Sequence, residues 1–364
     1  MALAVVIAIP VLSISTASAA TDYSKVTVAA QGGRLAGIEA ECKKEGQLNV
    51  IALPHYWADY ASMLAGFKAK YGVKIDEADP EAGSQDEIDA AIANKGTSRS
   101  PDVFDISLAV AAKYAGTGTF APYKVTKWRY LLGAAAKSST GEFTPNYTGT
   151  MTIGYNGELG TITKLEDLLL PKFKGKVSLN GDPLISGAAL NGVLMINKAV
   201  GGSFDDLSKG VAFFKKLKEV GNFINVNPTP ATIASGQTPV VIDNGYLMVG
   251  VQKLMTAAGK SWKMFTPASV GSTYNSAVSA WAPHPACARL WMEYVFSEEG
   301  ANIWAAGGAT PTLWLRMVAT RRTSPAGVAA IGKSKVSADA ATSDQAKAAV
   351  VYLKTAWPAA VGNK

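Results

Sequence analysis

Acidic and aromatic side chains stand where predicted strands end, and this combination is suited to binding a small polar molecule. His55, Tyr56 and Trp57 directly follow a buried apolar run, and Asp243 and Tyr246 stand at the end of another. Because ligands of open parallel sheets bind at the carboxyl ends of the strands, we expect these side chains to face one cleft. A carboxylate beside aromatic rings suits an ammonium group through its charge and through the ring face.

Two predicted helix starts add hydrogen-bond donors to the same edge of the sheets. One lies at Ser84 and Gln85, and the other lies at Ser186 and Gly187. The free amide groups of a helix N-terminus, together with a hydroxyl group, bind carboxylates and phosphates. These positions therefore predict an anion subsite beside the predicted amine subsite.

Four further side chains complete the candidate site. Asp105 ends a third predicted strand, and Asp182 precedes the second helix start. Tyr274 and Trp281 come from a later segment that is predicted to return to the first half of the chain. We expect all four to line the same cleft.

Each of these positions also allows a purely structural role, which the sequence leaves open. Ser84 and Glu87 have the S-x-x-E spacing of a helix capping box. Ser186 and Asp243 are also suited to capping the helices that follow them, and Tyr56, Trp57 and Trp281 are also suited to core positions.

Catalysis and metal binding find little support in the sequence. It has neither a G-x-S-x-G elbow nor a G-x-x-x-x-G-K-[ST] phosphate loop. Its two histidines, His55 and His284, form no close cluster with a cysteine, so we expect no zinc site and no cofactor. We expect the protein not to be an enzyme; an exported enzyme with a histidine base is the alternative from a different class.

The elements that position these residues alternate between strand and helix. Strands are predicted at 47–53, 73–75 and 101–106, separated by helices that bury one apolar face, and the second half repeats the alternation. Short connections between them indicate parallel, doubly wound sheets. A chain of 364 residues is long enough for two such α/β domains.

Several segments resemble, in the same order, the extracellular solute-binding proteins that serve polyamine, ferric-ion, thiamine and phosphonate importers. The most specific is Ile153-Gly154-Tyr155-Asn156 followed by Leu165-Glu166-Asp167-Leu168 and Pro171-Lys172-Phe173-Lys174-Gly175-Lys176-Val177. The other matching segments are 45–50, 67–75, 101–103, 283–289 and 297–300. Together they cover the chain from about Glu39 to Pro311.

The resemblance implies a type II periplasmic-binding-protein fold, with two Rossmann-like lobes that have mixed sheets and are joined by crossing strands. Residues 20–150 and 273–312 are then expected in the first lobe, and residues 151–272 and 313–364 in the second. The implied function is capture of a solute between the lobes and its delivery to a membrane permease of an ABC importer. The implied state is a monomer.

The ligand is narrowed by two departures from the family's patterns. Polyamine receptors carry an aromatic residue where Asp243 stands, and ferric receptors carry adjacent tyrosines, which this sequence lacks. We therefore expect a short amine or a zwitterion, such as putrescine or a γ-amino acid. A ferric ion, a phosphonate or a sugar phosphate remains the alternative ligand.

Composition and termini indicate an exported protein. Residues 1–19 are apolar and end in Ala17-Ser18-Ala19, the pattern of a cleaved signal peptide, which predicts a periplasmic location. The formal net charge is +7, but the basic residues are scattered, so we expect no nucleic-acid partner. Export permits a disulfide between Cys42 and Cys287, and two free thiols remain the alternative.

Overall fold

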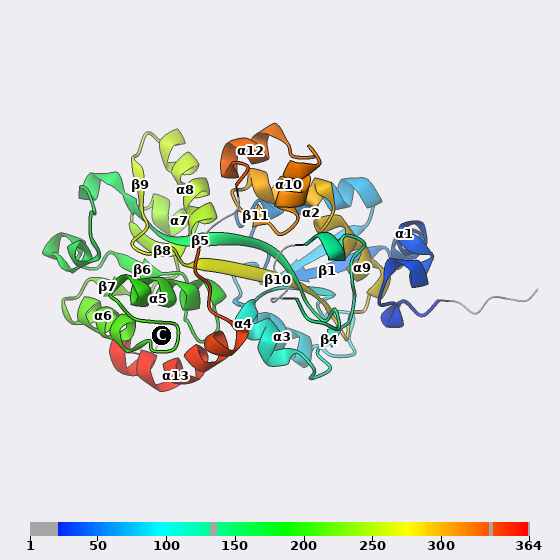
Figure 1. The fold of residues 1–364 in the computed structure, drawn as a ribbon, viewed down its shortest axis with the longest axis horizontal. Coiled ribbons are helices and arrows are strands. Elements are labelled where there is room, and N and C mark those ends of the chain that lie inside the picture. Colours follow the sequence, from blue (N-terminus) through cyan, green and yellow to red (C-terminus); the bar gives the residue numbers. More distant parts are fainter. Residues whose placement is uncertain (1–20, 132–136, 335–337, 363–364) are drawn as a thin grey trace, which may run out of the picture.

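The structure is a computed structural model that describes residues 21–131, 137–334 and 338–362. The signal peptide predicted for residues 1–19 lies outside these ranges. The described chain forms two α/β lobes side by side, joined by long strands that run between them (Figure 1). The predicted fold class is thereby confirmed.

The first lobe is built on strands from both halves of the chain. β1 (Gln47–Ile51) pairs in parallel with β2 (Lys74–Ala78), while β3 (Val103–Ser107) contacts β1 and pairs antiparallel with β10 (Gly271–Ser279). Helix α1 (Arg34–Glu45) precedes β1, and the helices that follow β1, β2 and β3 are α2 (Tyr60–Tyr71), α3 (Ser84–Ala93) and α4 (Leu108–Tyr114). β10 comes from far along the chain, so the sheet of the first lobe is complete only with a strand that follows the second lobe in sequence.

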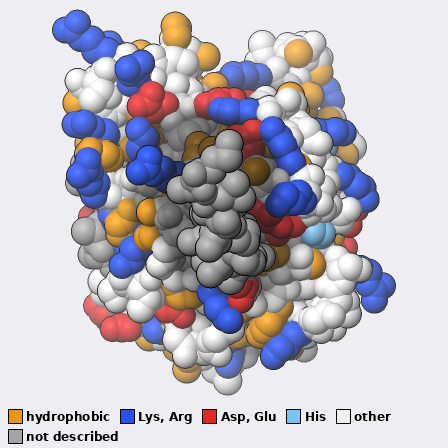
Figure 2. All heavy atoms as spheres, turned by 90° about the vertical axis from the view of Figure 1, so that its right-hand side faces the viewer, with side chains coloured by type: hydrophobic (Ala, Val, Ile, Leu, Met, Phe, Trp, Pro, Cys, Tyr) orange, Lys and Arg blue, Asp and Glu red, His pale blue; other side chains and the backbone are white. Residues whose placement is uncertain are grey.

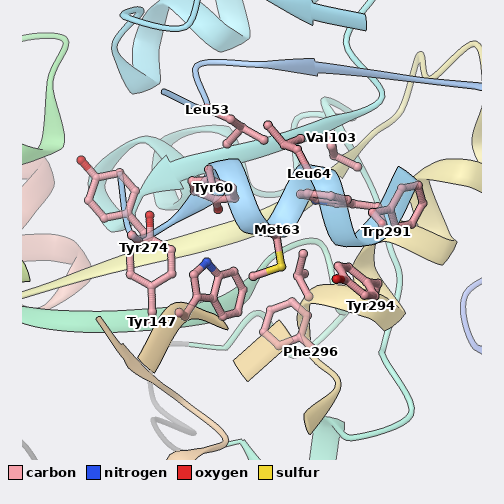
Figure 3. Packing of buried hydrophobic residues seen from close by; sticks show 14 of the residues in the cluster. Leu53, Tyr60, Met63, Leu64, Val103, Tyr147, Tyr274, Trp291, Tyr294 and Phe296 are labelled. Carbon is pink, nitrogen blue, oxygen red and sulfur yellow. The ribbon is translucent and has the colours of Figure 1, made fainter. Parts of the chain in front are cut away.

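Helix α2 shows how the sequence determines the buried face and the end of a helix in this lobe. Its buried side chains recur at helical spacing, and the helix ends at Gly72, whose φ of 69° suits a residue without a Cβ. Figure 3 shows Tyr60, Met63 and Leu64 of this helix within the main hydrophobic cluster. Tyr147 and Tyr274 lie at the end of that cluster nearer to the second lobe.

Strand β5 (Thr144–Asn156) crosses from the first lobe to the second. Its first half pairs antiparallel with β10, and its second half pairs antiparallel with β8 (Val240–Asn244) and β9 (Trp262–Phe265). β10 makes the return crossing beside it (Figure 1). The side chains on both strands are therefore close to both lobes.

The second lobe repeats the α/β arrangement on a mixed sheet. β6 (Val177–Leu179) pairs in parallel with both β7 (Phe223–Ile224) and β8. Its helices are α5 (Gly187–Ala199), α6 (Ser208–Glu219), α7 (Pro230–Ala234) and α8 (Gly245–Ala257). The carboxyl ends of β6 and β8 face the first lobe, which brings the loops that follow them to the space between the lobes.

The chain then returns to the first lobe. The returning segment forms the short strand β11 (Thr310–Pro311) and the helices α9 (Pro285–Val295), α10 (Glu298–Ala306), α11 (Trp314–Ala319) and α12 (Pro325–Ile331). The short strand β4 (Phe120–Ala121), which precedes β5 in the chain, pairs with β10. α9 packs on α1, and α10 packs on α2 and α12. We therefore propose to count residues 313–331 with the first lobe, which would shift the boundary expected from the sequence.

Cys42 on α1 and Cys287 on α9 form a disulfide, with an Sγ–Sγ distance of 1.97 Å and a Cα–Cα distance of 4.4 Å. The bridge joins residues 245 positions apart in the sequence. The side chain of Glu45 accepts the main-chain N–H groups of Ala286 and Cys287 at 2.9 and 2.7 Å, which fixes the start of α9 beside the bridge. Of the two possibilities left open by the sequence, the structure has the disulfide.

The C-terminal segment links the lobes a third time. Gly271 N donates to Asp339 O at 2.7 Å, and Asp339 N donates to Ser269 O at 3.0 Å, so this segment runs beside β10 where the lobes meet. Helix α13 (Ser343–Val361) then packs on α4 of the first lobe and on α6 of the second (Figure 1).

The end of the first lobe that carries α1 is seen face-on in Figure 2. Lys and Arg side chains on this face are interspersed with acidic, apolar and uncharged groups. Within the described residues, none of the helices combines the length and the apolar character needed to span a bilayer.

Candidate functional site

A cleft of about 710 Å³ lies between the lobes at the carboxyl ends of β1, β3 and β6. The first lobe contributes the segment after β1, the loop before α3, the start of α3 and the end of β3. The second lobe contributes the loop between β6 and α5. The lining residues are Ala52, Pro54, Tyr56, Trp57, Pro80, Glu81, Ala82, Gly83, Ser84, Asp86, Glu87, Asp105, Asn180, Gly181, Asp182, Ile185, Ser186, Gly187, Asn227 and Tyr274.

Asp105 is the best-organised acid of this cleft. Its Oδ2 accepts the hydroxyls of Tyr60 and Tyr147 at 2.9 and 2.6 Å, and its Oδ1 accepts Asn146 Nδ2 at 2.6 Å. Trp57 Nε1 donates to the Tyr147 hydroxyl at 2.6 Å, which extends the network to the cleft wall. Burial raises the pKa of Asp105 to about 6, and the three donors oppose that rise.

Glu87 and Ser84 of α3 bind strand β3 rather than their own helix. Glu87 Oε2 accepts the main-chain N–H of Asp105 at 2.9 Å, and Ser84 Oγ accepts that of Ser107 at 3.0 Å. The predicted capping box of Ser84 and Glu87 is wrong: Gly83 is the N-cap residue, and its N–H donates to Asp86 Oδ2 at 2.8 Å. Gly83 and Asp86 have the same three-residue spacing as Ser84 and Glu87. The side chains of Ser84 and Glu87 do not cap the helix, because they accept hydrogen bonds from β3.

On the second lobe, the loop between β6 and α5 faces the cleft with the start of a helix. Ser186 caps α5, because its Oγ accepts Ala189 N at 3.2 Å, and this hydroxyl also donates to Asn180 O. Asp182 lines the cleft, and its Oδ1 accepts Leu184 N. Gly187 begins the helix at the cleft wall, where the positive end of the helix dipole points.

Asp243 and Tyr246 lie beside the cleft, at the end of β8 and the start of α8. Asp243 is 3 % exposed and accepts Asn180 Nδ2 and Asn244 N, both at 2.7 Å; burial raises its pKa to about 7. The buried hydroxyl of Tyr246 has no hydrogen-bond partner among the described residues. Asp243 is thus already hydrogen-bonded within the second lobe, whereas Asp105 lines the cleft directly.

Aromatic rings form one side of the cleft. Tyr274 stacks on Tyr147, with ring centroids 5.8 Å apart, and Trp57 meets the edges of Tyr274 and Tyr246. Tyr56 donates its hydroxyl to Glu81 Oε2 at 2.7 Å at the cleft rim. Burial raises the pKa of the Tyr274 phenol well above its usual range, so this group is neutral.

Three of the residues predicted from the sequence point elsewhere. His55 is mostly exposed and pairs with Glu77 at 2.7 Å, and Trp281 packs in a small apolar cluster beneath Lys95. The Gln85 side chain binds Asp89, Lys113 and Tyr114 on the outer side of α3 and α4. Only the main chain of Gln85 approaches the second lobe, where its N–H donates to Ile185 O at 3.2 Å.

The structure also adds residues that the sequence did not single out for binding. Glu81, Asp86, Glu87 and Asn180 line the cleft, and Tyr60, Asn146 and Tyr147 support Asp105 from behind. Tyr60 belongs to the buried face of α2, and its hydroxyl also donates a hydrogen bond to Asp105. The sequence did contain one indication of these residues. Asp86 and Glu87 are adjacent acids in the first turn of α3, and adjacent carboxyl groups can bind a cation.

Five carboxyl groups line the cleft, namely those of Glu81, Asp86, Glu87, Asp105 and Asp182, and its described lining residues include no Lys, Arg or His. The cleft therefore favours a cation by charge. Among the described residues, His, Cys, Asp and Glu side chains come within ligand range of one another as a group of three only at Cys42, Glu45 and Cys287, where the two sulfurs are already bonded to each other.

Comparison with known proteins identifies what the chain resembles. A profile described as "Bacterial extracellular solute-binding protein" matches residues 98–357, which is more than half of the chain. Solved structures of low sequence identity share the fold over nearly the whole molecule.

Three of these structures illustrate the range of solutes that are named for proteins of this fold. The periplasmic binding protein AfuA from Actinobacillus pleuropneumoniae, with fructose-6-phosphate bound, is 19% identical, with a TM-score of 0.66 over 87% of this chain and 99% of that one. Iron-bound HitA from Pseudomonas aeruginosa is 18% identical, with a TM-score of 0.60 over 87% and 99%. A putative spermidine/putrescine ABC transporter from Listeria monocytogenes is 15% identical, with a TM-score of 0.59 over 85% and 99%.

Proposed function

The chain belongs to the family of bacterial extracellular solute-binding proteins, and on that basis we propose that it captures a short amine or a zwitterion in the cleft between its lobes. In this proposal it acts in the periplasm as a monomer and delivers the solute to the permease of an ABC importer. The cleft at the carboxyl ends of the strands is the place where ligands of such sheets bind.

The observation that carries the proposal is the charge of the cleft wall. Among the described residues, five carboxyl groups and no basic side chain line it, and Asp105 is 6 % exposed. A buried carboxylate without a cation is costly, and three neutral donors reduce that cost only in part. An ammonium group would supply the missing charge, so Asp105 is the anchor that we favour over Asp243.

The aromatic wall supports the same ligand class. Trp57 and Tyr274 line the cleft next to Asp105, with their rings at an edge-to-face angle of 69°. Ring faces attract ammonium groups, more strongly where water is excluded. Alkyl parts of a short amine would also bury apolar surface against these rings.

A zwitterion is compatible with the opposite wall. The N-terminus of α5 faces the cleft at Ser186 and Gly187, and the first turn of this helix has no acidic side chain. A carboxylate placed there would meet the main-chain N–H of Gly187 and the positive end of the helix dipole. A γ-amino acid would span from this wall to Asp105.

The alternative ligands fit the wall less well. A phosphonate or a sugar phosphate would bring about two negative charges to a wall of carboxyls. A ferric ion would need phenolates, but burial raises the pKa of Tyr246 and Tyr274 well above the usual range, and the described lining of the cleft has no basic side chain to oppose that rise. We also propose that nothing is turned over in the cleft.

The test is a binding screen by thermal shift and isothermal titration calorimetry with putrescine, γ-aminobutyrate, fructose 6-phosphate and ferric citrate. We expect putrescine or γ-aminobutyrate to raise Tm; saturation at 100 times Kd stabilises the folded state by about 2.7 kcal/mol. Recovery of the unchanged solute by chromatography checks that no product forms. A shift with the phosphate or the iron compound and none with the amines would reject the proposed ligand class.

A further inference from the structure

Glu87 and Asp105 form a pair of carboxyl groups at the floor of the cleft. They are 1 % and 6 % exposed, both line the cleft, and the main-chain N–H of Asp105 binds Glu87 Oε2 at 2.9 Å. Two buried carboxyl groups that line one cleft, on residues joined by this hydrogen bond, do not both ionise readily, because each charge opposes the other and neither is solvated.

The groups that face this pair are neutral or acidic. Tyr60 comes from α2, Tyr147 from β5, Tyr246 from α8 and Tyr274 from β10, and their phenols all sense the charge of Asp105. Of the other carboxyl groups, Asp86 on α3 acts on the charge of Glu87, and Asp243 on β8 acts, like Asp105, on the phenol of Tyr274. No cationic side chain among the described lining residues compensates the pair.

We propose that Glu87 and Asp105 together hold one proton in the empty cleft, and that an arriving ammonium group drives this proton into solvent, so that solute capture is coupled to proton release. This inference rests on the proposed function, because it needs a cationic solute. It assigns Glu87 a role in binding in addition to its bond to β3.

The proton resides on Glu87 in this scheme. Burial and the neighbouring Asp105 raise the pKa of Glu87 well above its usual range, while the pKa of Asp105 is about 6. A unit positive charge about 4 Å away, at an effective dielectric constant of about 20, is enough to lower a carboxyl pKa by about three. Glu87 then changes from COOH to COO⁻, the proton goes to the buffer, and the ammonium group faces two carboxylates.

The experiment counts protons by calorimetry. Putrescine and γ-aminobutyrate are titrated into the full-length mature protein at pH 8 in two buffers of different ionisation enthalpy, since the difference in observed heat gives the protons released. This pH lies above the pKa values of Asp105 and Asp243, which are about 6 and about 7, so these two groups are not the expected source of a released proton. A variant of Glu87 tests whether the proton comes from that residue. We expect about one proton released for each solute bound.

The variant Glu87→Gln keeps an acceptor for Asp105 N–H and removes the proton source. We expect it to bind with proton release close to zero and with an affinity that no longer rises with pH. The matched control is Glu293→Gln, which changes a carboxyl that binds the Tyr123 hydroxyl at 2.9 Å on the far side of the first lobe. The control variant should release the same number of protons as the wild type.

The outcomes separate this inference from the proposed function. If neither amine binds, the proposed ligand class fails. If an amine binds to the wild type and the heat is the same in both buffers, proton coupling alone is rejected, whatever the variants do. If Glu87→Gln releases as many protons as the wild type, the proton comes from another group and the role of Glu87 is wrong.

Discussion

Gly187 at the start of α5 and Ser107 at the end of β3 touch across the two lobes, and a Cβ at position 187 would lie only 2.3 Å from the Ser107 Cβ. A methyl group has no room there while the lobes are in this arrangement. The contact lies at the cleft wall, close to the hydrogen bond from Gln85 N to Ile185 O. These are two of the places where the lobes meet around the cleft.

We predict that Gly187→Ala holds the lobes apart and weakens solute binding about tenfold or more, because the closed arrangement then carries a steric cost. Calorimetry measures Kd, and small-angle X-ray scattering should show a larger radius of gyration with ligand present. The control is Gly250→Ala on α8, where a Cβ meets no atom within 4 Å. Unchanged affinity in Gly187→Ala would show that this contact plays no part in capture.

Replacement of Asp105 by Asn should weaken amine binding about 100-fold, because it removes one partner of a buried charge pair. Asp243→Asn should cost less than tenfold, because Asp105 lines the cleft and Asp243 is not among its lining residues. Calorimetry with the best amine of the screen ranks the two variants. A larger loss of affinity in Asp243→Asn than in Asp105→Asn would show that Asp243, and not Asp105, binds the ammonium group.

The ligand-free protein should lose stability as the pH rises from about 4 to about 7. Burial raises the pKa of Asp105 to about 6 and that of Asp243 to about 7, from 3.8, so the folded state binds more protons than the unfolded state in this window. His284, whose pKa is raised from 6.5 by its hydrogen bond to Asp102, acts in the same direction, but only above about pH 6.5, because below that pH the imidazole is protonated in both the folded and the unfolded state. We expect Tm to fall by several degrees across the window.

The check is a Tm profile from pH 4 to pH 8 in the wild type and in the double variant Asp105→Asn, Asp243→Asn. The slope should be flatter in the double variant, since two of the titrating groups are gone. A profile of equal slope in both proteins would mean that these carboxyls do not control the acid dependence.

Loss of the disulfide should reduce stability and leave solute binding intact. The bridge closes a loop of 245 residues, for which the chain-entropy estimate is roughly 5 kcal/mol as an upper value. Cys42 and Cys287 lie on α1 and α9, and neither lines the cleft. Denaturation of the variant Cys42→Ala, Cys287→Ala measures the stability loss, and calorimetry should return the wild-type Kd; a large change in Kd would contradict the separation of bridge and cleft.

Most of the fold could be predicted from the sequence because its signals are local. The strands around 47–53, 101–106 and 239–242 and the helix that begins at Ser186 follow from apolar runs, capping residues and glycine stops. The pairing of β10 with β3 and β5 could not be derived from these signals, since it joins residues about 120 to 175 positions apart in the sequence. The family resemblance supplied that part.

The candidate site was only partly accessible to sequence reasoning. Strand ends located Tyr56, Trp57 and Asp105. The segment predicted to return to the first lobe supplied Tyr274, but it also supplied Trp281, whose side chain turns into an apolar cluster. Glu87 has the spacing of a capping residue, and spacing along one helix cannot reveal a bond to a strand. Which face of an element meets the other lobe depends on tertiary packing, and a single sequence does not encode it in any short pattern.

The third link between the lobes has a mechanical consequence. Two adjacent strands, β5 and β10, form a ribbon that can both bend and twist, whereas α13 lies across α4 and α6 at a distance from that ribbon. Because α13 contacts both lobes, any movement of one lobe against the other must also change the packing of this helix on α4 or on α6. The position of Gly187 against Ser107 therefore depends on the C-terminal helix as well as on the two crossing strands.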